Sequence, residues 1–369
     1  MKVKIMYTEV IRIIEGALKN DSSKVLSYAN LLVENLRKNG EVKAADRIAL
    51  ILNNKAINPV FRDQLMNAPV DQESRLTMAD IIMPGDPLSE VILSEMMKNT
   101  IDTFIGLINH RDKLRTVGID VNASLLLYGP PGCGKTTIAK FVAHELKLPL
   151  VIARLDSLIS SLLGNTAKNL RKVFDFSSNR PCILLLDEFD AIAKARDDQH
   201  ELGELKRVIN SLLQNIDEFT AAGNILIAAT NHQELLDKAI WRRFNYVVEV
   251  GKPDKKNVIN LISSTMNTFT NNIINDIKRM DMAAESMNGL SFAEIKTVCN
   301  NAISKAIIDG KEELVLEDLI TQLFLFHHNN KYENESLVKF LESNGLSKPS
   351  IAEYLGISYR KAASIIDKK

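Results

Sequence analysis

The spacing of apolar residues predicts helices at the start of the chain. From residue 5 to residue 53, apolar side chains recur every three or four positions, and the polar turns Asn20-Asp21-Ser22 and Asn39-Gly40 interrupt them. This periodicity is typical of amphipathic helices, so residues 1–55 are predicted to form a small helical module. Prolines and glycine break up residues 56–87, which predicts a linker.

A different pattern begins at residue 88, where short apolar runs alternate with longer amphipathic stretches. The runs are SLLLY, LPLVIARL, CILLLDEF, NILIAATN and NYVVEV. This alternation is typical of a parallel sheet covered by helices on both faces, with its working residues at the carboxyl ends of the strands. Residues 88–254 are therefore predicted to form an α/β domain. The pattern is wholly helical at residues 255–326 and again at residues 331–369.

A glycine-rich loop follows the first of these strands, in the stretch LLLYGPPGCGKTTIAKF. Gly129, Gly134, Lys135 and Thr136 fit the pattern G-x-x-x-x-G-K-[ST], with a strand before it and a helix after it. Glycines let backbone N–H groups approach phosphates, the lysine places a charge on the outer phosphates, and the threonine hydroxyl is a ligand for Mg²⁺. The predicted nucleotide-binding residues are Gly129, Pro130, Pro131, Gly132, Cys133, Gly134, Lys135, Thr136 and Thr137.

Two adjacent carboxylates end the buried strand ILLLD. Asp187 has the position of a residue that holds Mg²⁺ together with Thr136, and Glu188 can accept a proton from an attacking water. Carboxylates at a strand end often form only a polar boundary, but the phosphate loop upstream argues against that here. Asp190 caps the following helix as easily as it serves the site.

Four motifs in this order, GPPGCGKTT, ILLLDEFDAIA, IAATN and AIWRRFNYVVEVGKPD, resemble those of AAA-type ATPases over residues 88–326. The resemblance implies Mg²⁺-dependent ATP hydrolysis by a P-loop domain followed by a helical lid domain. It also implies a ring of identical subunits, most often a hexamer. Asn231 matches the polar residue that orients the lytic water beside Glu188.

The resemblance further assigns an arginine finger, which reaches the nucleotide of the neighbouring subunit. Arg243 matches the first finger of the family, while the frequent second arginine falls on Tyr246. Such a finger stabilises charge on the transferred phosphoryl group and is worth ~10³ to 10⁵ in rate. Either Arg242 substitutes for the second arginine, or one finger suffices.

The stretch ISSLLGNTAKNLRKVF matches the substrate-gripping loop of the family. Leu162, Leu163 and Gly164 stand where an aromatic residue, an aliphatic residue and glycine are usual. An aliphatic grip on a polypeptide and a role for both leucines in the helix core are the two interpretations. The ATPase core also looks like small bacterial AAA proteins that accompany a subtilisin-like protease, which makes a separately encoded protease a candidate partner.

The end of the chain, SKPSIAEYLGISYRKAASIIDKK, has the apolar spacing of a helix-turn-helix with Gly356 at the turn. Its second helix would expose Ser358, Arg360 and Lys361 for contact with DNA. The alternative is a helical hairpin that docks on the ring or on a partner protein.

Composition narrows these interpretations. The chain has 369 residues, of which 46% are hydrophobic, and its 46 basic residues equal its 46 acidic ones, so attraction to nucleic acid has to be local. Three scattered cysteines indicate a reducing compartment. No apolar run approaches the about 18 residues of a membrane helix, which predicts a cytoplasmic protein without a membrane partner.

We expect an ATPase that remodels, unfolds or delivers a protein client. An ATPase that acts at DNA in defence, replication or repair is the alternative.

Overall fold

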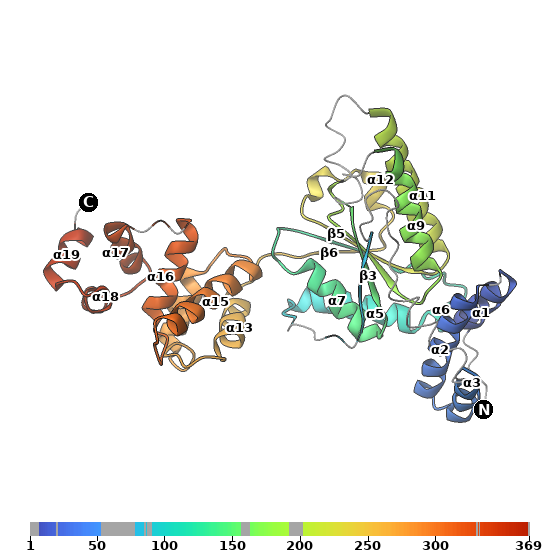
Figure 1. Ribbon diagram of the computed structural model, residues 1–369, viewed down its shortest axis with the longest axis horizontal. Coiled ribbons are helices and arrows are strands. Elements are labelled where there is room, and N and C mark those ends of the chain that lie inside the picture. Colours follow the sequence, from blue (N-terminus) through green and yellow to red (C-terminus); the bar gives the residue numbers. More distant parts are fainter. Residues whose placement is uncertain are drawn as a thin grey trace. The chain divides into compact units, whose positions relative to one another are not determined.

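The computed structural model describes residues 7–19, 21–52, 78–84, 86, 91–155, 163–191, 202–329, 331 and 333–367. The chain divides into two compact units (Figure 1). The first consists of Met1–Gly129 and Lys135–Val250, and the second of Pro130–Gly134 and Gly251–Lys369.

A six-stranded sheet forms the centre of the first unit, in the order β1-β3-β4-β5-β2-β6. Its strands are β1 (Asp80–Ile82), β2 (Ser124–Tyr128), β3 (Leu150–Arg154), β4 (Ile183–Asp187), β5 (Ile225–Thr230) and β6 (Tyr246–Glu249). Strands β2 to β6 pair in parallel, and β1 pairs antiparallel with β3. The strands β2, β4 and β5 are buried on both faces, which explains their continuous apolar sequences.

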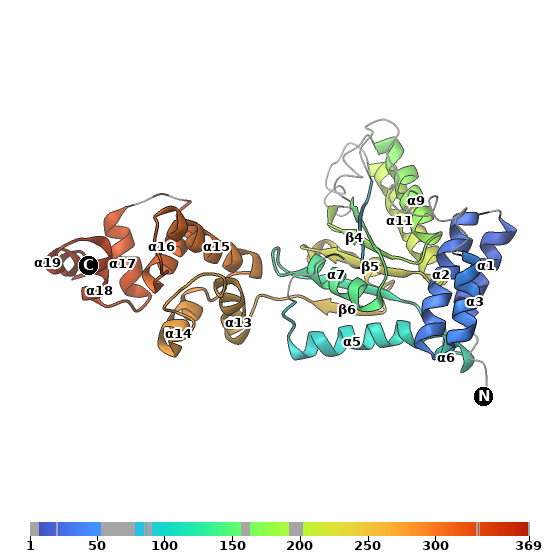
Figure 2. The same cartoon turned by 60° about the horizontal axis from the view of Figure 1, so that its bottom comes forward.

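Helices cover both faces of this sheet. Figures 1 and 2 show α9 and α11 on one face, and α5 and α7 on the other. The helices of this part are α5 (Glu95–Asn109), α6 (Arg111–Thr116), α7 (Lys135–Leu146), α9 (Leu163–Ser178), α11 (Leu202–Ala221), the short η2 (Gln233–Leu235) and α12 (Lys238–Trp241). The predicted α/β class is confirmed. Among the described residues, no helix is long and apolar enough to cross a membrane.

The strand β1 lies in the segment predicted to be a linker, residues 56–87. Its backbone pairs with β3, with Ile81 opposite Val151, and Met78 and Ala79 before it are buried in the core. This end of the segment therefore belongs to the sheet. A three-residue strand is too short to produce a recognisable period in the sequence. Residues 56–77 lie outside the described part of the chain.

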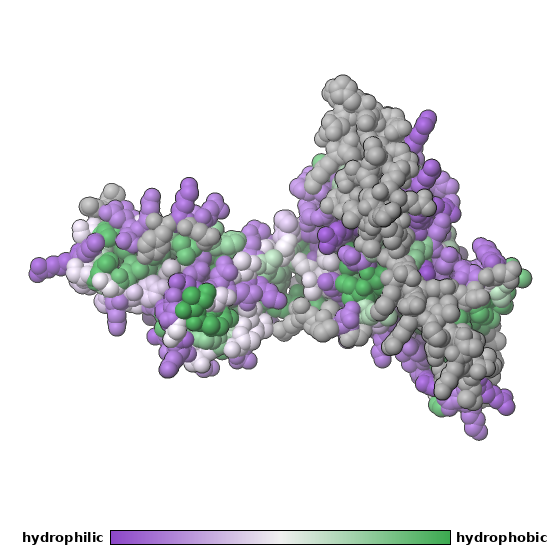
Figure 3. Space-filling model, viewed as in Figure 1, coloured by the Kyte–Doolittle hydropathy of each residue, from purple (hydrophilic) through white to green (hydrophobic). Residues whose placement is uncertain are grey.

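The N-terminal helices belong to the first unit. They are α1 (Tyr7–Leu18), α2 (Ser22–Lys38) and α3 (Val42–Leu52). The Asp21 side chain caps α2 by accepting a hydrogen bond from the Lys24 N–H. Much of the apolar side of α1 points to solvent, because Ile11, Ile14 and Leu18 are 48%, 53% and 81% exposed. Figure 3 shows apolar residues on the surface at the position of this helix.

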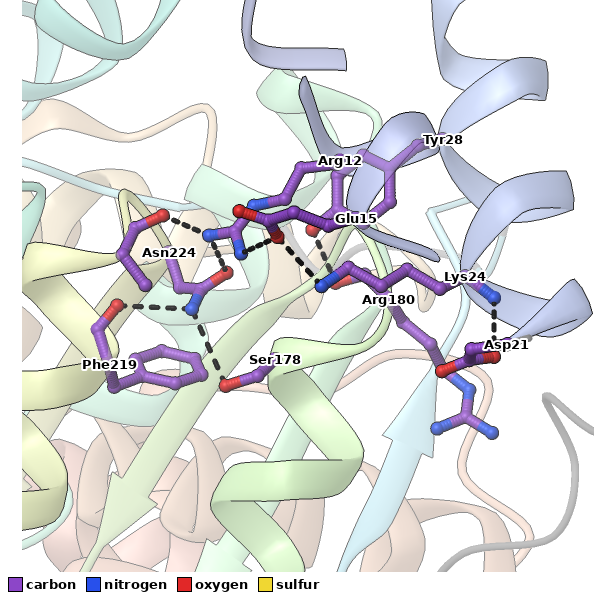
Figure 4. A network of polar contacts seen from close by, with 10 residues as sticks. Arg12, Glu15, Asp21, Lys24, Tyr28, Ser178, Arg180, Phe219 and Asn224 are labelled. Carbon is purple, nitrogen blue, oxygen red and sulfur yellow. Dashed lines mark hydrogen bonds and ion pairs between the residues drawn. The ribbon is translucent and has the colours of Figure 1, made fainter. Parts of the chain in front are cut away.

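The polar side of α1 faces the α/β core of the first unit instead. Arg12, which is buried, donates to the carbonyl of Ala222, just beyond the end of α11, and to the side chain of Asn224, 3.4 Å away (Figure 4). Glu15 accepts from Arg12 at 3.1 Å and from Lys24 at 3.0 Å. A cation at the C-terminal end of a helix is favourable, because the last carbonyls carry partial negative charge.

A second set of polar contacts joins α1 to α6. Arg111 pairs with Glu9 at 2.9 Å, and the Thr8 hydroxyl donates to Asp112 at 2.8 Å. Thr8 also accepts from Arg115 at 2.9 Å. Because Thr8 and Glu9 are both buried, removing these partners would leave polar atoms without hydrogen bonds. The contacts therefore fix the N-terminal helices to the core of the first unit.

The second unit is helical. It contains α13 (Lys255–Met266), α14 (Ile277–Ser286), α15 (Phe292–Ile308), α16 (Leu316–His327), α17 (Asn334–Ser343), α18 (Lys348–Leu355) and α19 (Tyr359–Asp367). Ile262, Val298 and Leu319 from the first four helices, and Leu337 and Ile351 from the last three, are all 0% exposed in one cluster. The predicted lid and the predicted C-terminal module therefore share one apolar core.

We expect Arg12→Ala to lower the free energy of unfolding by about 2 kcal/mol, because the variant leaves buried acceptors without a donor. Urea denaturation measures this difference. The control is Arg37→Ala in the same module, because Arg37 and its partner Asp46 are 56% and 55% exposed and such pairs contribute about 0.5 kcal/mol. Equal decreases in the two variants would show that Arg12 does not secure α1.

Candidate functional site

The carboxyl ends of three neighbouring strands bring the predicted site residues together. Strands β4, β5 and β2 are adjacent and parallel, so they end at the same edge of the sheet. Asp187 is the last residue of β4, Asn231 follows β5, and Lys135 begins the helix after the loop that follows β2. This is the edge at which open α/β sheets bind their ligands.

The loop after β2 requires glycine at its first position. Gly129 has a φ of +140°, and a Cβ built on it would lie 2.3 Å from the carbonyl oxygen of Val250. The side chain of Lys135, which is 7% exposed, donates to the Gly129 carbonyl at 2.7 Å. The lysine ammonium is thereby held beside the start of the loop.

The five middle residues of the loop, Pro130 to Gly134, belong to the second unit. There, the N–H of Ala293 donates to the carbonyl of Gly132 at 3.0 Å, and a Cβ on Gly132 would lie 2.7 Å from the Ser291 hydroxyl. Ser291 caps α15 in a capping box with Glu294, and the Ser291 N–H holds the pKa of Glu294 below its usual value. Cys133 is buried, with its sulfur 3.8 Å from the Pro131 carbonyl.

Thr136 and Asp187, the two predicted Mg²⁺ ligands, touch each other. The Thr136 hydroxyl donates to a carboxylate oxygen of Asp187 at 2.9 Å. A hydroxyl and a carboxylate are oxygen ligands of the kind that Mg²⁺ takes, usually with phosphate oxygens and water completing its shell. In the described part of the chain no group of three or more His, Cys, Asp or Glu could hold a metal ion. This pair therefore fits Mg²⁺ bound together with phosphates better than a cation held by protein alone.

Glu188, the predicted base, has an unusual backbone. Its φ is +55°, a left-handed conformation that residues other than glycine rarely adopt and that costs about 1–3 kcal/mol. Neighbouring contacts maintain it: the Glu188 N–H donates to Asp187 at 3.0 Å, and the Phe189 N–H donates to the Ala229 carbonyl at 2.9 Å. Phe189 is fully buried against Phe244. Packing thus fixes the direction in which the chain leaves β4.

Asp190 links this turn to the end of β5. One oxygen of its buried carboxylate accepts from the Thr230 hydroxyl at 3.1 Å and from the Asn231 N–H at 3.2 Å. Asp190 therefore holds the backbone of Asn231. From the sequence alone, a helix cap was an equal alternative for Asp190, because nothing in the sequence shows that β5 lies beside β4.

The predicted finger Arg243 contacts an acidic residue of its own chain. Its Nε and Nη2 donate to the two oxygens of Asp217 on α11, at 2.9 and 3.0 Å, and its Nη1 donates to the Ala239 carbonyl at 2.6 Å. Arg242 next to it is exposed. Tyr246, where a second arginine is frequent, packs its ring on Phe104 with centroids 5.5 Å apart, so it joins β6 to α5.

The remaining predicted residues fall at three other places in the sequence. Leu162 lies outside the described residues, and Leu163 begins α9 without a described side chain. Thr137 follows Thr136 on α7. Ser358, Arg360 and Lys361 lie in the second unit, at the start of α19.

The sequence is similar to known families. A family model described as "ATPase family associated with various cellular activities (AAA)" matches residues 125–252. The chain is 39% identical over 246 residues to an uncharacterized AAA family ATPase of Sinorhizobium fredii, which covers 67% of this chain and 73% of that protein.

The chain is also similar to proteasome-activating nucleotidases. The identity is 35% over 234 residues to proteasome-activating nucleotidase 1 of Haloferax volcanii, covering 62% of this chain and 57% of that protein. It is 36% over 230 residues to the proteasome-activating nucleotidase of Sulfurisphaera tokodaii, covering 60% and 57%. The chain thus matches little more than half the length of these nucleotidases.

We expect Asp190→Ala to lower the kcat of ATP hydrolysis by about tenfold or more while nucleotide affinity changes by less than about threefold, because the variant releases Asn231 and leaves the phosphate loop intact. Steady-state hydrolysis and the binding of a fluorescent ATP analogue measure the two quantities. Asp102→Ala, an exposed position on α5, is the control. An unchanged kcat in Asp190→Ala would show that the Asn231 backbone needs no such anchor.

Proposed function

We infer that this chain, which belongs to the AAA family of ATPases, uses ATP hydrolysis to unfold, remodel or deliver a protein client. Its membership makes it an ATPase. The similarity to proteins named proteasome-activating nucleotidases supports a protein client. The observation that carries the proposal is the meeting of Lys135, Thr136, Asp187 and Asn231 at one edge of the sheet.

Each residue of this edge has a proposed part in hydrolysis. Lys135, held beside Gly129, binds the outer phosphates of ATP. Thr136 and Asp187 would hold Mg²⁺, which would offset the negative charge of the phosphates. Glu188 accepts a proton from the attacking water, and the amide of Asn231 orients that water without competing for its proton.

We propose that Arg243 acts on the nucleotide of a neighbouring subunit in a ring of identical chains, most often a hexamer in this family. Asp217 and the Ala239 carbonyl hold its guanidinium with three hydrogen bonds, which limits the conformations open to the side chain. A guanidinium oriented in advance loses less entropy when it binds phosphate oxygens. This contact supports Arg243, rather than the exposed Arg242, as the finger.

The partners of the ring are also proposals. The exposed side chains Ile11, Ile14 and Leu18 support a role for the N-terminal helices as an adaptor surface for a protein client. The proposal of a separately encoded subtilisin-like protease as a partner rests only on the resemblance of the ATPase core to small bacterial AAA proteins. An ATPase that acts at DNA is the second candidate function. It depends on the C-terminal helices and not on this site.

We expect Glu188→Gln to bind ATP with parent affinity but to hydrolyse it at least about a hundredfold more slowly, because the amide cannot accept the proton. Glu145→Gln, an exposed position on α7, is the control. Hydrolysis at the parent rate in Glu188→Gln would exclude Glu188 as the base.

The same Glu188→Gln variant tests the client, because an ATP-bound ring that does not turn over should retain its substrate. Affinity purification in ATP, followed by mass spectrometry, should recover protein clients that are absent when ADP replaces ATP. Stimulation of the parent ATPase by an unfolded protein is the second readout. A variant that recovers the same proteins in both nucleotides would argue against a remodelling function.

We expect Arg243→Ala to reduce kcat by about a thousandfold and Arg242→Ala to change it by only a few-fold, because only Arg243 is oriented by Asp217. Mixing Arg243→Ala chains with Glu188→Gln chains should restore part of the activity, since an intact site can then receive a finger from its neighbour. Absence of recovery at every mixing ratio would contradict a finger supplied between subunits.

A further inference from the structure

The last three helices of the second unit form a helix-turn-helix. α17, α18 and α19 all pack on one another. α18 ends at Gly356, whose φ of +62° is left-handed, and the N–H of Ile357 donates back to the Ala352 carbonyl at 3.0 Å. Ser358 then starts α19 by accepting the Lys361 N–H at 3.3 Å. The turn therefore has three residues, as in helix-turn-helix proteins that bind DNA.

The inner face of this motif is fully occupied. Ala362 and Ile365 of α19 are 0% and 6% exposed, and Ile365 shares a core cluster with Ile351 of α18 and Leu341 of α17. The small Ala362 side chain lets α19 approach closely. The apolar side of α19 is thus buried within the second unit, so only its polar side is exposed to a partner.

Further polar contacts hold α18 in place, and the outward side of α19 stays exposed. The Tyr354 hydroxyl donates to Asp318 of α16 at 3.0 Å, and the Ser350 hydroxyl donates to Glu317 of the same helix. Lys348 of α18 pairs with Asp367 at the end of α19 at 2.7 Å. α18 is therefore anchored to α16, and the one acidic residue of α19 has its charge offset by Lys348.

The outward side of α19 carries donors and cations. Ser358, Tyr359, Arg360, Lys361 and Ser364 are all exposed. Neither Arg360 nor Lys361 forms an ion pair with another residue that the structure describes. The centre of a protein interface is usually apolar and poor in lysine and serine, although arginine and tyrosine are frequent there, whereas phosphates and base edges present acceptors to all of these donors. Charge and hydrogen-bonding chemistry therefore favour nucleic acid over a second protein.

We propose that α19 enters the major groove of duplex DNA. Residues at its N-terminal end, Ser358 to Lys361, face the base edges and the flanking phosphates, while α18 crosses above it. The partner is B-form DNA because the major groove of duplex RNA is too narrow and deep for a helix. This DNA-binding role is independent of the proposed protein client, because it uses no residue of the ATP site.

The test measures binding of the full-length protein to a fluorescent random-sequence DNA duplex by anisotropy, at about 50 mM salt, where attraction to phosphates is strong. The double variant Arg360→Ala/Lys361→Ala should bind at least about tenfold more weakly. The slope of log affinity against log salt should fall by up to about two, one for each phosphate that the variant no longer neutralises. Duplex RNA should fail to compete.

The matched control is Lys256→Ala/Lys278→Ala, which removes the same charge from exposed positions on α13 and α14. It should bind the duplex as the parent does. Both double variants should keep the parent melting temperature, because all four side chains are exposed. Any weaker binding by the α19 variant then reflects the two missing cations rather than unfolding.

Three results would overturn the proposal. The first is that the parent fails to bind the duplex at low salt, and the second is that the two double variants bind it equally well. The third is that the α19 variant still binds DNA but no longer binds an unfolded protein. The last result would assign α19 to a protein partner. Failure here leaves the Glu188→Gln result unchanged, so the DNA-binding role and the ATPase proposal are tested separately.

Discussion

The arrangement of the site depends on the parallel register of β4, β5 and β2. Leu186 lies opposite Ala228, and Leu126 lies opposite Ala228 on the other side, so the three strands end within one residue of the same level. Side chains alternate between the two faces of a strand, so a shift of one residue would turn Asp187 to the opposite face. Such a shift would break backbone hydrogen bonds on both sides of a buried strand, because β4 also pairs with β3 and β2 also pairs with β6.

The sequence predicted those features that a short stretch of chain encodes by itself. Gly129 and Lys135 identify the loop because their spacing is local, and the apolar runs identify five of the six strands. The contacts of Asp190 with Thr230 and of Asp217 with Arg243 join residues 40 and 26 positions apart. The spacing of apolar residues along the sequence does not predict such pairs. These pairs depend on the strand order and on the position of α11.

The N-terminal helices show a second limit of prediction. Apolar spacing located the helices, but it suggests that apolar residues are buried, whereas α1 buries Thr8, Glu9 and Arg12 and exposes Ile11 and Ile14. The reason is that α1 lies against the end of α11 and against α6, where carbonyls and charged side chains require polar partners. The identity of the neighbouring surface, and not the sequence of α1, decides which side is inside.

The position of Arg12 has a mechanical consequence. α11 contains 20 residues, so it is a rod about 30 Å long at 1.5 Å per residue, and its last turns carry Asp217 close to the Ala222 carbonyl that Arg12 grips. A force on α1 therefore acts on α11, the helix whose Asp217 side chain orients the guanidinium of Arg243. In the proposed ring, where Arg243 would reach the nucleotide of the neighbouring subunit, a force on the N-terminal helices would be passed to that nucleotide through one stiff helix.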